Sequence, residues 1–145
     1  MHDYLGCNTG WTYFSHTGLC YKYFDIWHTW TVARAECRDE HEGDLASVPD
    51  QDTNNFLASL TTSRVWIGGH DSDQEGTWAW SDGTPWDFQN WASGEPGNHN
   101  NVTDQDYLYI NYQSAGLWDD AGTEFRTGFI CQQETSDTTS KILCL

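Results

Sequence analysis

Glu95-Pro96-Gly97-Asn98 and Trp118-Asp119-Asp120 lie in the middle of the stretch from Trp66 to Cys131, around which the rest of this sequence is organised. Each motif brings carboxylate or amide oxygens together, a polar loop separates the two motifs, and aromatic residues flank both. A hard cation such as Ca²⁺ takes about 6–8 oxygen ligands and needs neither thiolate nor imidazole. The stretch therefore predicts a calcium site on a loop, and Pro96 restricts the backbone beside its first acidic residue.

The composition limits the class of protein. With 145 residues, of which 37% are hydrophobic and 15% aromatic, the chain has room for one domain with one core. Nine Trp against a single Met favour a compact extracellular module or a carbohydrate binder, in which rigid rings fill the core and part of the surface. The formal net charge of −16 disfavours nucleic acid and anionic membranes as partners. The global charge needs no explanation beyond solubility, so only the local acidic clusters inform on function.

The cysteines indicate where the protein acts. Five cysteines in a chain of this length favour an oxidising compartment, and the odd number predicts one unpaired thiol. No apolar run is long enough to span a membrane, and no signal-peptide core follows Met1-His2-Asp3. The chain is therefore interpreted as a mature secreted domain over residues 1–133, followed by a polar tail over residues 134–145.

A hairpin and two helices are expected in the first half of the chain. Residues 7–20 carry aromatic residues on both sides of a turn and a cysteine at each end, which indicates a hairpin closed by a disulfide. Residues 29–42 show apolar residues at helical spacing, with Cys37 on the buried stripe. A second helix is expected after Pro49, with Asp50 as its N-cap.

After Ser63 the sequence changes to short apolar segments bounded by Gly, Asn and Asp, which is typical of strands. Residues 65–69, 78–80, 107–110 and 128–131 are the expected strands. Residues 83–106 show no regular period, and a loop of that length in a small domain is normally functional or disordered. The aromatic residues of this loop favour order.

Several motifs occur in a characteristic order. They are Cys37, Trp66-Ile67-Gly68-Gly69, Trp78-Ala79-Trp80-Ser81-Asp82-Gly83, Asn90-Trp91, Gly94-Glu95-Pro96, Trp118-Asp119-Asp120 and Phe129-Ile130-Cys131. Together they resemble the C-type lectin-like domain, in its long form with an extra N-terminal hairpin, over residues 5–133. The resemblance implies an α+β fold with two helices, a small antiparallel sheet that links the termini, and an upper sheet below a long loop that binds calcium and often sugar. It also implies the disulfides Cys7–Cys20 and Cys37–Cys131, which leaves Cys144 unpaired.

The resemblance further implies two calcium sites. The ligands of the principal site would be Glu95, Asn98 or the Gly97 backbone, Asp104 or Gln105, Asp119 and Asp120. Those of the second, structural site would be Asp71, Glu75, Asn98 and Asp106. A sugar binds such a principal site through two vicinal hydroxyls, which coordinate the ion and hydrogen-bond to the same side chains. Glu95, Asn98, Asp119 and Asp120 are therefore also candidate sugar-binding residues.

Three departures from the family pattern bear on this site. Tyr107 and Thr123 occupy the positions of the two cysteines that normally form a bridge under the long loop. Gly97 stands where family lectins carry Asn or Asp in the Glu-Pro-Asn or Gln-Pro-Asp triplet. Asp119 replaces the usual Asn, which removes two N–H donors and adds a charge, so it favours the ion over the sugar.

Other residues have simpler interpretations. Trp86 is a candidate for stacking on the apolar face of a sugar, with core packing as the alternative, whereas Trp91 is interpreted as core. The six His are scattered without metal spacing, so zinc is not expected. His70 and His99 lie near the proposed ligands and are candidates for pH sensitivity. Asn101-Val102-Thr103 is a glycosylation sequon inside the loop.

These observations predict a secreted, calcium-dependent carbohydrate-binding domain. The sequence contains neither a Ser-His-Asp order nor a Gly-x-Ser-x-Gly elbow, so an enzyme is not expected. The resemblance implies that Glu95 favours mannose- or fucose-type ligands over galactose. The expected partners are glycans on cells or on secreted glycoproteins. The alternatives are a protein-binding lectin-like domain without sugar activity and an ice-binding protein. A disulfide-linked dimer through Cys144 is also expected.

Overall fold

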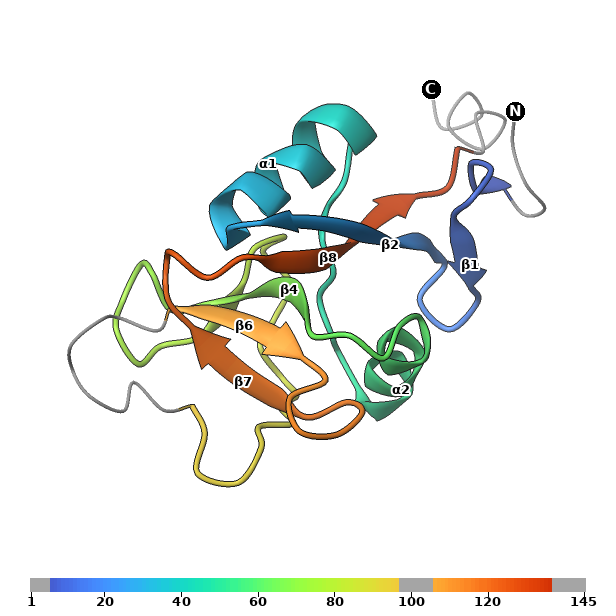
Figure 1. Ribbon diagram of the computed structural model, residues 1–145. Coiled ribbons are helices and arrows are strands. Elements are labelled where there is room, and N and C mark those ends of the chain that lie inside the picture. Colours follow the sequence, from blue (N-terminus) through green and yellow to red (C-terminus); the bar gives the residue numbers. More distant parts are fainter. Residues whose placement is uncertain (1–5, 97–105, 137–145) are drawn as a thin grey trace.

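The computed structural model describes residues 6–96 and 106–136, and in them two helices accompany one mixed sheet (Figure 1). The sheet runs in the order β1-β2-β8-β4-β6-β7, with β3 paired to β8 and β5 paired to β4. The elements are β1 (Thr12–Phe14), β2 (Leu19–His28), α1 (Trp30–His41), β3 (Asp44–Leu45), α2 (Gln51–Ser59), β4 (Val65–His70), β5 (Ala79–Trp80), β6 (Tyr107–Ile110), β7 (Trp118–Ala121) and β8 (Thr127–Glu134). The expected α+β fold is confirmed, and neither helix of the described part has the length and apolar character of a membrane span.

Strands β2 and β8 bring the two ends of the domain together (Figure 1). They pair antiparallel from Leu19 opposite Glu134 to Phe24 opposite Phe129. The sequence pattern placed only the start of β2 in a strand, because its outer half is exposed and has no clean alternation of apolar and polar residues. The expected domain boundary at residue 133 falls inside β8.

Both expected disulfides are present. Cys7 is bonded to Cys20 at the N-terminal hairpin, and Cys37 of α1 is bonded to Cys131 of β8. The second bond spans 94 residues of sequence against 13 for the first, so in the chain-entropy picture it contributes about 4–5 kcal/mol against about 3 kcal/mol.

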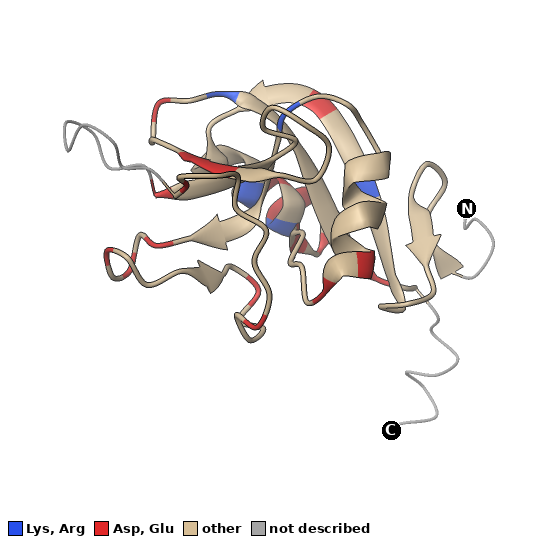
Figure 2. Ribbon diagram, turned by 90° about the horizontal axis from the view of Figure 1, so that it is seen from below, with Lys and Arg blue, Asp and Glu red and all other residues tan. Residues whose placement is uncertain are grey.

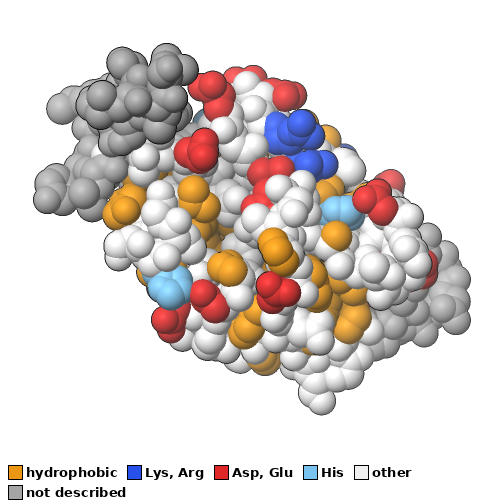
Figure 3. Space-filling view, turned by 180° about the vertical axis from the view of Figure 1, so that it is seen from behind, with side chains coloured by type: hydrophobic (Ala, Val, Ile, Leu, Met, Phe, Trp, Pro, Cys, Tyr) orange, Lys and Arg blue, Asp and Glu red, His pale blue; other side chains and the backbone are white. Residues whose placement is uncertain are grey.

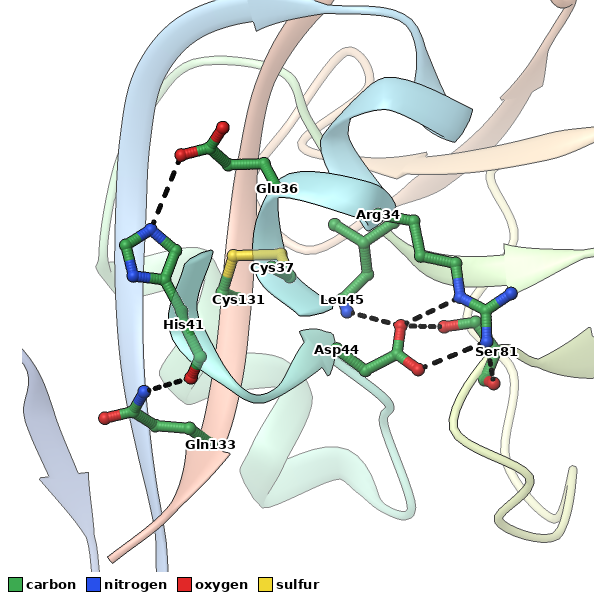
Figure 4. The surroundings of a disulfide bond; sticks show 9 residues. All are labelled: Arg34, Glu36, Cys37, His41, Asp44, Leu45, Ser81, Cys131 and Gln133. Atoms are coloured by element: carbon green, nitrogen blue, oxygen red, sulfur yellow. Dashed lines mark hydrogen bonds and ion pairs between the residues drawn. A yellow bond between two sulfur atoms is a disulfide. The ribbon is translucent and has the colours of Figure 1, made fainter. Parts of the chain in front are cut away.

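Polar contacts surround the second disulfide and fix α1 to its neighbours (Figure 4). Arg34 donates two hydrogen bonds to the Asp44 carboxylate, at 3.1 and 3.3 Å, and a third to the carbonyl of Ser81. Gln133 donates to the carbonyl of His41 at the end of the helix. Gly43 follows at a point where β8 approaches so closely that any Cβ would collide with the carbonyl oxygen of Gln132.

Trp118 lies in the core cluster that also contains Trp80 and Leu108. Its ring is fully buried, its Nε1 donates to Asn54 Oδ1 at 2.7 Å, and its edge contacts are with a ring of aromatic side chains. These are Trp80, Trp86, Phe88 and Trp91, with ring centroids 5.6–5.9 Å from that of Trp118. The strand that carries Trp118, β7, was not predicted, because Trp-Asp-Asp-Ala lacks both length and an apolar period.

Aromatic contacts occupy the place of the third family disulfide. The ring of Tyr107 stacks on Trp30 with centroids 4.6 Å apart and meets the edge of Trp66 at 6.4 Å. Tyr107 pairs with His70, the last residue of β4, so this stack lies at the point where the chain leaves β4 and enters the loop that starts at Asp71. Packing therefore holds the base of the loop without a covalent bond.

One exposed ion pair predicts a pH dependence of stability. Nε2 of His16, in the turn between β1 and β2, lies 2.7 Å from Oδ2 of Asp50, whose other oxygen accepts from the N–H of Thr53 as the N-cap of α2. Hydrogen bonding to Asp50 raises the pKa of His16, and the bond from His16 lowers the pKa of Asp50. The stabilisation is thus complete below the ordinary His pKa of about 6.5 and is lost as the pH rises through the raised value. At the acid end it is lost as the pH falls through the lowered pKa of Asp50.

We expect His16→Gln to lower the melting temperature at pH 5.5 by more than at pH 8.5, when both are compared with the parent. The effect should be small and should shrink in 1 M salt, because the two side chains are 41% and 44% exposed. Equal differences at the two pH values would contradict a contribution from this pair.

Candidate metal centre

Two groups of carboxylates come together near the end of β4, the start of β6 and strand β7. The first group is Asp71, Glu75 and Asp106, and the second is Glu95, Asp119 and Asp120. Within each group, one carboxylate oxygen from every residue lies within 4.8 Å of the others. Asp and Glu are spread over most loops of the protein (Figure 2), so geometry, and not abundance, singles out these six.

The register of the sheet builds the first group. His70 ends β4 opposite Tyr107 at the start of β6, so Asp71 and Asp106 become neighbours, and the N–H of Asp71 donates to the carbonyl of Asp106 at 3.0 Å. Asp71 is 3% exposed, and its Oδ2 accepts from the N–H of Gly76 at 2.9 Å, which folds the turn that carries Glu75 back over the group.

The second oxygen of Asp71 lacks a hydrogen-bond partner among the residues that the structure describes. Asp71 Oδ1 is buried and accepts no hydrogen bond from any residue in the described ranges. A buried carboxylate oxygen without a partner costs roughly 1–3 kcal/mol or more. A cation held jointly by the first group would remove this cost, since hard divalent cations coordinate carboxylate oxygens directly.

The second group depends on the way the long loop is tied to β7. The N–H of Trp118 donates to the carbonyl of Asn90, and the carbonyl of Trp118 accepts from the N–H of Ala92. The loop therefore runs beside β7 and then turns at Glu95, whose N–H bonds to Ala92. This places Glu95 against the two carboxylates of β7, of which Asp120 is 2% exposed.

Tyr109 holds one of these carboxylates in place. Tyr109 and Asp119 are opposite each other in the β6–β7 pair, and the Tyr109 hydroxyl donates to Asp119 Oδ2 at 2.7 Å. Burial, together with this hydrogen bond to an anion, raises the pKa of Tyr109, so the phenol remains a donor at all physiological pH values. One oxygen of Asp119 is thus oriented by the protein, and the other is available for a ligand.

A hollow of about 410 Å³ connects the two groups. Asp71 and Glu75 of the first group and Glu95 and Asp120 of the second are among its lining residues. Its remaining walls are Gly76, Trp78, Gln89, Trp91 and Pro96, and the rings of Trp78 and Trp91 meet at 4.8 Å. Carboxylates beside apolar aromatic surface suit a ligand that is polar on its edge and apolar on its face, as a sugar ring is.

The aromatic walls of the hollow include one residue that was expected in the core. Trp91 does pack against the core, and its partly buried ring also lines the hollow. Trp78, which the sequence pattern placed in a strand and not in the site, lies beside it. Trp86 packs behind them against Trp80, with centroids 4.5 Å apart, and is not among the lining residues. The Trp78-Ala79-Trp80 motif predicts a strand, and it gives no sign that the ring of Trp78 lines a ligand site.

Some expected residues lie outside the described ranges. They are Gly97, Asn98, His99, Asn101, Asp104, Gln105 and Cys144. His70 is described: its Nδ1 lies 3.0 Å from Ser72 Oγ, and burial lowers its pKa because it disfavours the charged imidazolium.

Comparison with known proteins agrees with this architecture. The family model of the lectin C-type domain matches residues 26–133. An alpha-N-acetylgalactosamine-specific lectin of Patiria pectinifera is 30% identical over 139 residues, covering 88% of this chain and 80% of that protein. The carbohydrate-recognition domain of the mouse scavenger receptor C-type lectin has a TM-score of 0.79 at 29% identity, over 89% of this chain and 97% of that one. A calcium-independent type II antifreeze protein has a TM-score of 0.78 at 27% identity, over 89% and 95%.

Proposed function

The chain belongs to the C-type lectin family, and from this premise we propose that it is a secreted lectin that binds carbohydrate through calcium and performs no catalysis. The observation that carries the proposal is the buried Oδ1 of Asp71, which lacks a partner among the described residues. Asp71 belongs to one of two carboxylate groups that both contribute residues to one aromatic-walled hollow. The two disulfides support an extracellular location.

The residues present fit calcium. Six carboxylates in two groups offer hard oxygen ligands, and neither group contains a thiolate or an imidazole. We assign Glu95, Asp119 and Asp120 to the principal ion and Asp71, Glu75 and Asp106 to the second. Asn98, with Asp104 or Gln105, would complete these sites from the long loop.

Each part of the hollow has a separate task in this proposal. A bound calcium would coordinate two vicinal hydroxyls of the sugar. The carboxylates of Glu95 and Asp119 accept hydrogen bonds from those hydroxyls, and Tyr109 keeps Asp119 oriented for it. Trp78 and Trp91 offer ring surface to the apolar face of the sugar.

The sugar is proposed from the triplet that begins at Glu95. Glu95 favours mannose- or fucose-type ligands, although the relative from Patiria pectinifera is named for N-acetylgalactosamine. A glycan array in calcium, repeated in EDTA, tests both the function and the preference. Glycan signals that disappear in EDTA would support the lectin; an array without signals in either condition would favour a protein-binding domain that lacks sugar activity.

Ice binding is a second candidate, because the antifreeze protein named above shares the fold at 27% identity. Thermal hysteresis of the purified protein, measured with and without calcium, distinguishes this candidate from the lectin. A hollow lined by carboxylates favours the lectin, since ice binding is expected of a flat surface.

Calcium is expected to stabilise the fold. At a calcium concentration one hundredfold above Kd, linkage contributes about 2.7 kcal/mol, which corresponds to a rise of roughly 10 °C in Tm for a domain of this size. The gain should fade in acid as the ligand carboxylates become protonated. Differential scanning calorimetry in EDTA, calcium and magnesium measures it, with Asp71→Asn as a variant that keeps the shape but loses the charge. A melting curve that EDTA leaves unmoved at neutral pH would count against the calcium site.

Asp119→Asn is expected to weaken calcium binding and to preserve or strengthen sugar binding. The neutral amide removes one negative charge from the surroundings of the ion. Its oxygen can still accept from the Tyr109 hydroxyl, and its nitrogen can donate to a sugar hydroxyl. A millimolar sugar affinity corresponds to a binding free energy of about −4 kcal/mol. The N–H donor that Asn restores should make this binding free energy more favourable by roughly 1–3 kcal/mol. Titration of saturating-calcium samples with methyl mannoside and fucose, followed by NMR, measures the change. A variant that binds both calcium and sugar as the parent does would contradict the assignment.

A further inference from the structure

A second hollow, of about 380 Å³, lies between the end of α2 and the turn that joins β6 to β7. Its lining residues are Ala58, Thr62, Arg64, Asn111, Gln113, Ser114 and Ala115. None of them is acidic. In contrast, the hollow beside α1 includes Glu42, Asp44, Asp82 and Glu134, and the hollow between the metal groups includes four carboxylates.

Arg64 is the charged residue of this hollow, and its guanidinium lies over two tyrosine rings, 5.8 Å from the centroid of Tyr109 and 5.6 Å from that of Tyr112. Within the described ranges it forms no ion pair and donates no hydrogen bond. This is unusual in a chain with 22 acidic and 6 basic residues. Arg34, by comparison, is held by Asp44, and on the face shown in Figure 3 carboxylates lie directly beside the basic side chains.

The rings prepare the guanidinium for a ligand. Cation–π contacts orient its plane without using its N–H groups, so the donor fork remains available for a planar oxyanion. An arginine that is already oriented loses less side-chain entropy when it binds.

The turn beside Arg64 is rigid. Asn111 donates from Nδ2 to the carbonyls of Thr61 and Ser63, both at 2.9 Å, and its Oδ1 accepts from the N–H of Gly116. Asn111 and Gln113 have φ values of 71° and 64°, in the left-handed region that non-glycine residues seldom adopt. The tied turn thus includes two lining residues of the hollow that can donate hydrogen bonds, Gln113 through its amide and Ser114 through its hydroxyl.

One side chain connects this hollow to the metal centre. Tyr109 carries the guanidinium of Arg64 over its ring and donates its hydroxyl to Asp119. A single side chain therefore separates Arg64 from a carboxylate proposed for the principal calcium.

We propose that Arg64 and the rim of this hollow form a subsite for a single oxyanion, a carboxylate or a sulfate, carried by a glycan whose neutral hydroxyls bind at the calcium. The role in glycan selection rests on the proposed function; the oxyanion site itself does not. Because the protein has a net charge of −16, the ligand is an otherwise neutral saccharide with one acidic group and not a polyanion.

The first test uses sodium sulfate and sodium acetate on the full chain at constant ionic strength, with chloride as the balancing anion. We expect saturable NMR shifts of the Arg64 side chain and of the amides of residues 113–115. Arg64→Gln should abolish the amide shifts, and Arg64→Lys should weaken them because lysine lacks the planar fork. Arg38→Gln removes the same charge from α1 and should change nothing. Shifts that grow linearly with anion, or that both Gln variants lose equally, would overturn the proposal.

The second test compares neutral oligosaccharides with their singly sulfated or uronic acid counterparts on an array in calcium. The acidic member of a pair should bind about tenfold more tightly, and Arg64→Gln should remove that advantage without weakening the neutral member. Neutral binding with no acidic advantage would refute the subsite's role and leave the lectin function standing. Saturable sulfate shifts with no neutral glycan binding would refute the lectin function and leave the oxyanion site standing.

Discussion

Asp120→Ala is expected to abolish calcium-dependent glycan binding while the domain remains folded. Asp120 is 2% exposed, belongs to the second carboxylate group and lines the hollow, so its removal deletes a carboxylate that is proposed to bind the ion. The loss of a charged contact of this kind, about 2.7 kcal/mol, lowers calcium affinity by about one hundredfold. The fold should survive, because β7 pairs with β6 through its backbone.

The matched control is Asp87→Ala, which removes an exposed carboxylate from the same long loop and belongs to neither group. Calorimetric titration with calcium should separate the two variants, and near-UV circular dichroism should show the same tryptophan signal for both. Parent-like calcium and glycan binding by Asp120→Ala would move the site elsewhere and bring the protein-binding alternative forward.

The helices were predictable because their signals are local. Asp50 caps α2 as predicted, α1 lies within the expected range 29–42 with Thr29 as its N-cap, and Cys37 lies on its buried face as the spacing predicts. Strands β2 and β7 were not predictable in this way. Their residues show no clean alternation of apolar and polar side chains, and they form strands because β8 and β6 supply partners from other parts of the chain.

The site was predictable only in part for the same reason. Asp71 and Asp106 are far apart in sequence, and the pairing of His70 with Tyr107 is what makes them neighbours. Family resemblance supplied that grouping; spacing along the chain did not. Tyr109 was missed because a tyrosine in an apolar strand gives no sign that its hydroxyl will meet the carboxylate opposite it.

Trp118→Ala is expected to destabilise the domain by about 3–5 kcal/mol, a large part of the 5–15 kcal/mol typical of such domains. The substitution removes a fully buried ring that four aromatic side chains contact, and it leaves Oδ1 of the buried Asn54 without its donor. The backbone of Trp118 also carries the loop that ends at Glu95. Calcium affinity should therefore fall as well, although no ligand has been altered.

Trp27→Ala is the matched control. It deletes the same side chain from a position that is 69% exposed, so the difference between the two variants reports the contribution of burial and packing. Its effect on the free energy of unfolding should stay within about 0.5 kcal/mol. Urea denaturation in EDTA measures both variants without a contribution from calcium, and Trp118→Phe should fall between them, since it keeps a ring but loses the N–H. If Trp118→Ala and Trp27→Ala lower the free energy of unfolding by the same amount, the aromatic side chains around Trp118 do not stabilise this part of the sheet. The carboxylates on β7 would then owe their placement to the β6–β7 backbone pairing alone.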